Sequence, residues 1–87
     1  MKSERQLMDE IEGDLIRLEQ FTDEAIRHDV QAAYDKLPSV PRSVIRKTIN
    51  AMMDAYALPP ETEYERSIMA RMQVQRDRWD RIMREME

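Results

Sequence analysis

Few residues in this chain have the chemistry for catalysis or metal binding. It contains one histidine, His28, and no cysteine. Glu24 stands four positions before His28, so on a helix the two side chains would share a face. Di-iron helical bundles instead place glutamate and histidine three residues apart and use two histidines. We therefore expect His28 to be a surface residue beside a carboxylate, and we predict no metal and no cofactor.

The motifs of nucleophilic and phosphate chemistry are also missing. With a single glycine, the chain has neither a glycine-rich phosphate loop nor a nucleophile elbow. Carboxylate pairs such as Asp9-Glu10 and Asp23-Glu24 occur in any acidic helix, and acid–base catalysis needs them in a concave, dry site. A small helical domain seldom encloses such a site. We predict that the protein is not an enzyme, has no catalytic residues and acts on no small-molecule substrate.

Composition indicates one small helical domain over residues 1–87. Charged residues make up 37% of the chain and apolar residues 41%, with a net charge of −4, which is typical of a globular protein. A β-sandwich or barrel would need more than one glycine for its tight turns. The start of the chain lacks the apolar run of a signal peptide, and no stretch is long and apolar enough to cross a bilayer. We therefore expect a cytoplasmic protein.

Prolines divide the chain into three stretches with helical periodicity. Pro38 and Pro41 bracket one connection, and Pro59-Pro60 marks the next. The pattern predicts helices at about residues 3–37, 41–57 and 60–86.

The first stretch carries apolar residues three or four positions apart without loss of phase, which favours one continuous or merely kinked helix. Thr22-Asp23-Glu24 offers a break instead, because a threonine followed by acids is typical of a helix start. A helix of about 35 residues would be a rod of about 50 Å, and the second helix would cover only half of it. The sequence thus predicts an all-α domain of three helices with a long first helix, in a bundle completed by dimerisation.

The charge and apolar patterns suggest two contact surfaces for another protein. Residues 1–37 hold ten acids against five bases, and residues 59–87 hold six arginines among methionines and the only tryptophan. Buried aromatic residues and arginines dominate interface energetics. The predicted anchors are therefore Trp79, Met72 and Met83, with Arg71, Arg78 and Arg81 as polar partners. The alternative is that the tryptophan and methionines close the domain's own core.

The leading prediction is a non-enzymatic protein–protein interaction module, namely a small regulator, adaptor or inhibitor that binds a protein partner, a second copy of itself, or both. A second hypothesis is a nucleic-acid-binding regulator with a helix-turn-helix-like middle segment that presents Arg42, Arg46, Lys47 and Asn50. Against it, the pI of about 5.0 lacks the basic footprint of such domains. A third hypothesis is an acidic inhibitor of a nucleic-acid enzyme, of the kind that mobile elements encode.

Overall fold

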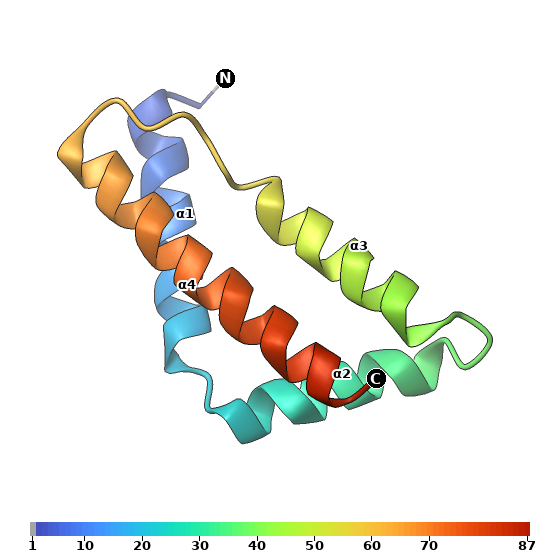
Figure 1. The fold of residues 1–87 in the computed structure, drawn as a ribbon. Coiled ribbons are helices and arrows are strands. Elements are labelled where there is room, and N and C mark those ends of the chain that lie inside the picture. The colour runs from blue at the N-terminus through green and yellow to red at the C-terminus, as the bar shows by residue number, and fades with distance from the viewer. Residues whose placement is uncertain (1) are drawn as a thin grey trace.

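The computed structural model describes residues 2–87, and these residues form an all-α domain (Figure 1). Its four helices are α1 (Glu4–Gln20), α2 (Asp23–Lys36), α3 (Arg42–Asp54) and α4 (Glu63–Glu85). A hydroxyl side chain caps the start of three of them by accepting a backbone N–H: Ser3 for α1, Thr22 for α2 and Thr62 for α4. Ser3 and Gln6 form the reciprocal capping box.

The prediction of one helix over residues 3–37 is wrong, so the chain has four helices rather than three. Phe21 and Thr22 adopt extended backbone conformations between α1 and α2. The Thr22 hydroxyl accepts the backbone N–H of Ala25 at 3.1 Å, which starts α2. A straight rod of about 50 Å would also exceed the longest dimension of the molecule, which is 41 Å. The break instead turns α2 back so that its apolar side is buried.

The C-terminal helix α4 is the element against which all the others pack. Its first half packs with α1 around the buried side chains Met8, Ile11, Leu15, Ile68 and Met72. Its second half packs with α2 and α3 around Ile26, Val30, Tyr34, Ile45, Ile82 and Met83. The core is therefore two clusters arranged along one helix.

The backbones of α1 and α3 stand apart on α4. No Cα atom of α1 comes within 8 Å of one in α3, and Figure 1 shows the two helices diverging. The long rod that motivated the predicted dimer is absent, so dimerisation stays a prediction. None of the helices in the described residues is long and apolar enough to span a membrane.

Candidate interaction surface

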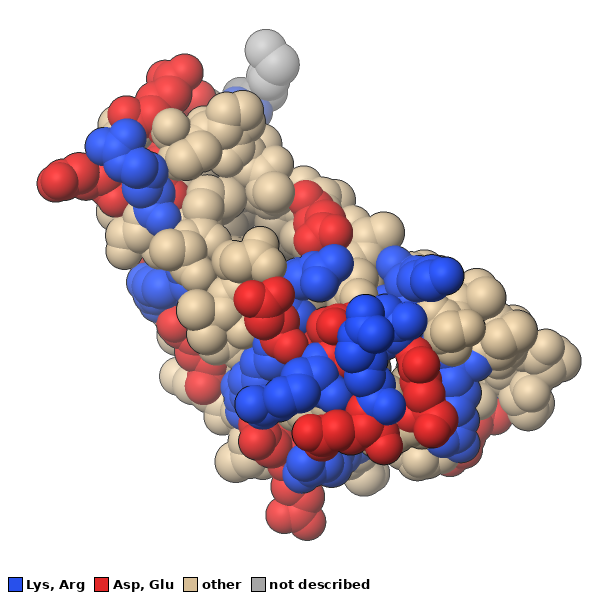
Figure 2. Space-filling view, viewed as in Figure 1, with Lys and Arg blue, Asp and Glu red and all other residues tan. Residues whose placement is uncertain are grey.

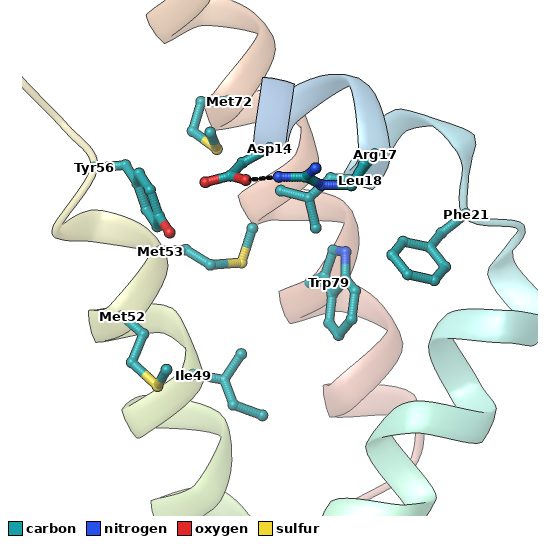
Figure 3. A pocket seen from close by; sticks show the side chains of 10 residues that line it. All are labelled: Asp14, Arg17, Leu18, Phe21, Ile49, Met52, Met53, Tyr56, Met72 and Trp79. Carbon is teal, nitrogen blue, oxygen red and sulfur yellow. Dashed lines mark hydrogen bonds and ion pairs between the residues drawn. The ribbon is translucent and has the colours of Figure 1, made fainter. Parts of the chain in front are cut away.

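A groove of about 490 Å³ lies between α1 and α3, with α4 as its floor (Figure 3). Leu18 and Phe21 form the α1 wall, while Met72 and Trp79 rise from α4. The α3 side contributes Ile49, Met52, Met53 and Tyr56. Because its lining is mostly apolar, this groove is an unfilled continuation of the two core clusters.

A second hollow of about 330 Å³ extends the groove toward the start of α1. It shares Asp14 and Tyr56 with the first hollow and adds Leu7, Ile11 and Leu58. The 15 residues from Leu7 to Phe21 span about 20 Å, which is about four turns of helix. The continuous groove therefore matches the length of an ordinary helix.

Trp79 packs against the core cluster of α2, α3 and α4 and also lines the groove. Its ring makes an edge-to-face contact with Phe21, with centroids 6.2 Å apart and planes at 87°. The indole Nε1 is buried and has no hydrogen-bond partner among the described residues. Trp79 is thus partly a core residue and partly the floor of an open surface.

Charges are found on only one wall of the groove. Asp14 lines both hollows and forms an ion pair with Arg17, also on α1 (Figure 3). Opposite them, the α3 side chains that line the groove are all uncharged. The groove thus has one charged wall, on an acidic helix, and one neutral wall.

The structure separates the three apolar anchors predicted from the sequence. Met72 and Trp79 both line the groove, and Met72 is at the same time a buried member of the α1–α4 core cluster. Met83 is fully buried in the cluster of α2, α3 and α4, where its backbone oxygen accepts the Tyr34 hydroxyl at 3.3 Å. Met83 therefore occupies the core position that the sequence offered as the alternative.

The three predicted arginines hold α4 to α1 and to the start of α2. Arg71 Nε donates to Glu19 Oε2 at 3.0 Å, and this hydrogen bond lowers the pKa of Glu19. Arg78 Nε donates to Asp23 Oδ1 at 2.8 Å, which lowers the pKa of Asp23, and Arg81 lies 3.8 Å from the same carboxylate. All three are thus engaged within the chain.

Of the four residues of the nucleic-acid hypothesis, two are buried and two are exposed. Arg46 and Asn50 are buried against α4, and both donate to Asp80 Oδ1, at 3.3 and 2.7 Å. Arg42 is exposed but donates to the Met86 backbone oxygen. Lys47 is exposed, and no ion pair to it is found among residues 2–87.

Asp80 is the centre of this α3–α4 contact. Its side chain is only 15% exposed, and burial on its own would raise its pKa. Hydrogen bonds from Arg84, Asn50 and Arg46 outweigh the burial and lower the pKa of Asp80 to about 2. Asp80 therefore stays ionised and fixes one wall of the groove to its floor.

Charged side chains over the rest of the visible surface alternate in sign. Figure 2 shows lysines and arginines interleaved with acids on the face where α4 lies in front. His28 is exposed, and its Nδ1 lies 3.7 Å from Asp29 rather than beside Glu24. Among residues 2–87 no cluster of three histidine or acidic residues could hold a metal ion.

The α1 and α3 walls of the groove were not identified from the sequence. Phe21, Met52 and Tyr56 are large apolar residues that remain more than one-third exposed, and Met52 is 64% exposed. The signal that could have indicated them lies in residues 44–58, where apolar residues occupy more than one face of the helix. A helix with apolar residues on two faces needs two partners.

Comparison of the chain with protein-family models, with curated proteins and with solved structures finds no match.

Proposed function

We propose that this chain is a non-enzymatic protein–protein interaction module that holds the apolar face of a helix in the groove between α1 and α3. One observation carries this proposal: the two helices stand apart on α4 and leave an apolar groove open. Recognition of an amphipathic helix by such a groove is a common binding mode, in which side chains three or four positions apart enter the groove.

The exposed apolar area fits a protein interface. Five large hydrophobic residues that line the groove are between 37% and 64% exposed: Leu7, Phe21, Met52, Tyr56 and Leu58. At about 200 Å² for a large apolar residue, they expose roughly 450 Å². An interface of standard size buries about 800 Å² on each partner, of which somewhat more than half is apolar. The groove supplies an apolar area of that size.

A helix fits this groove better than a small molecule does. Small-molecule sites combine an enclosed apolar pocket with several convergent polar groups. Here the groove is elongated, and its charged lining residues, Glu10, Asp14 and Arg17, all lie on the α1 wall instead of converging from several sides. A groove about four helical turns long is longer than a compact ligand but matches a helical segment.

Site-specific photo-crosslinking in cells of the source organism tests the proposal. A p-benzoyl-phenylalanine at position 52 places the reactive group in the groove. The same group at position 74 is the matched control, because Val74 is 62% exposed on α4 and lines none of the hollows.

We expect a protein adduct from position 52 that position 74 does not give. The crosslinked peptide should belong to a helix with an apolar face. No adduct from position 52, or equal adducts from both positions, would contradict the proposal.

Of the other hypotheses, nucleic-acid binding gains no support from the geometry. Two of its four residues, Arg46 and Asn50, are buried and bonded to Asp80. Inhibition of a nucleic-acid enzyme by an acidic surface stays a prediction from the charge of residues 1–37.

A further inference from the structure

We infer that the helix held in the groove is α3 of a second copy of this chain. This inference rests on the proposed function, that the groove holds an apolar helix, and it names the occupant. Three features carry it: the uncharged outer face of α3, the opposite charges of α1 and α3, and the exposed apolar area.

The outer face of α3 has the character of a helix that is missing its partner. Val44, Thr48, Ala51 and Ala55 are exposed and follow each other at spacings of four, three and four residues. This spacing places them on one side of the helix, next to the highly exposed Met52. Because this face carries no charge, removing it from water costs little hydration free energy.

The charges of α1 and α3 are complementary. Within α1 six acids outnumber two bases, which gives a net charge of −4. On α3, Arg46 is buried and paired with Asp80 and Glu87, whereas Lys47 is an exposed base for which the described residues supply no ion pair. An α3 helix laid in the groove of another copy runs beside α1. Lys47 then approaches Glu10 and Asp14, which lie along the groove. Such an arrangement steers the two copies toward each other and fixes the orientation of the inserted helix.

With two-fold symmetry, the groove and the outer face of α3 belong to one contact. The helix α3 forms the neutral wall of its own groove and also enters the groove of the second copy. Each copy therefore fills the groove of its partner in the same way. The groove residues and Val44 become buried together. The roughly 450 Å² of exposed apolar area on each copy matches the apolar part of a standard interface, so the contact has the area that a stable dimer needs.

Sedimentation equilibrium of the purified chain tests the inference. The wild type should sediment at about 21 kDa, twice the 10.4 kDa of one chain. Met52→Asp places a carboxylate in the apolar contact, and we expect the dissociation constant to rise at least about 100-fold. Val74→Asp changes an equally exposed residue on α4 and should leave the dimer intact. Far-UV circular dichroism checks that each variant is folded.

A wild type that remains at 10.4 kDa up to about 1 mM, or a folded Met52→Asp that remains a dimer, would overturn the inference. If Met52→Asp does not fold, the dissociation constant of a Lys47→Glu dimer is measured instead. A weaker dimer supports the inference, and an unchanged dissociation constant overturns it.

The crosslinking of position 52 separates this inference from the proposed function. An adduct with a different protein refutes the second copy but retains the groove as a docking surface, whereas no adduct refutes both.

Discussion

Replacing Asp80 by asparagine tests whether the α3–α4 network fixes one wall of the groove. The Asp80 carboxylate accepts hydrogen bonds from Asn50 and Arg84 at 2.7 Å each and from Arg46 at 3.3 Å. These contacts lower its pKa from 3.8 to about 2. A lowered pKa means that the folded state favours the ionised carboxylate, so its charge stabilises the fold at neutral pH.

The size of the effect follows from the pKa difference. A shift of nearly two units corresponds to about 2 kcal/mol in the free energy of unfolding at pH 7. Because the folded pKa is the lower one, this contribution is present above the unfolded value of 3.8 and is lost as the pH falls through about 2. At pH 3 about half of it remains, since Asp80 is then mostly protonated in the unfolded chain.

Urea denaturation at fixed protein concentration measures this contribution. We expect Asp80→Asn to lower the free energy of unfolding by about 2 kcal/mol at pH 7 and by about half as much at pH 3. Asp77→Asn is the control, because Asp77 is exposed and accepts one hydrogen bond, from Gln73, and it should change stability by less than about 0.5 kcal/mol. The role given to Asp80 would be refuted if Asp80→Asn lowered the free energy of unfolding equally at both pH values, or did not lower it at all.

Substitutions at three further positions test other parts of the fold by urea denaturation at pH 7. Thr22→Ala should lower the free energy of unfolding by about 1 kcal/mol because it removes the cap of α2, and an unchanged value would contradict the break after α1. Gly13→Ala should raise it by about 0.5–1 kcal/mol, because a Cβ at position 13 meets no atom within 4 Å; a loss of stability would show that the space is not open. Trp79→Ala should cost about 3 kcal/mol, whereas Trp79→Phe should cost much less because it keeps a ring beside Phe21 and removes an unpartnered N–H; equal costs would contradict this packing.

Local sequence signals predicted most of the helices. The prolines delimit α3 and α4, as the sequence predicts. The pattern favours a continuous helix through Thr22 because the apolar stripe keeps its phase there, even though a capping signal is present. Periodicity describes which face of a segment is apolar, but it does not show whether two extended residues interrupt the helix.

The candidate site was only partly predictable, because its shape depends on how far apart the helices lie. Met72 and Met83 belong to the same apolar stripe of α4. Both are buried, but Met72, in the cluster of α1 and α4, also lines the groove, whereas Met83 is fully enclosed by α2, α3 and α4. Arg46 and Asn50 face Asp80, which is 34 and 30 residues away in the sequence. Pairings at such distances leave no local pattern.

The most direct test of the groove as a docking surface is an NMR titration that follows the methionine methyl groups. The eight methionines include Met52, Met53 and Met72 in the groove and the fully buried Met83. Spectra of ¹³C-methyl-methionine protein are recorded as its concentration rises. We expect the Met52, Met53 and Met72 signals to shift together while the Met83 signal stays in place. Unchanged groove signals up to about 1 mM, in a chain that sediments at 10.4 kDa over the same range, would refute the second copy as occupant. Shifts confined to methionines outside the groove would contradict the groove as the docking surface.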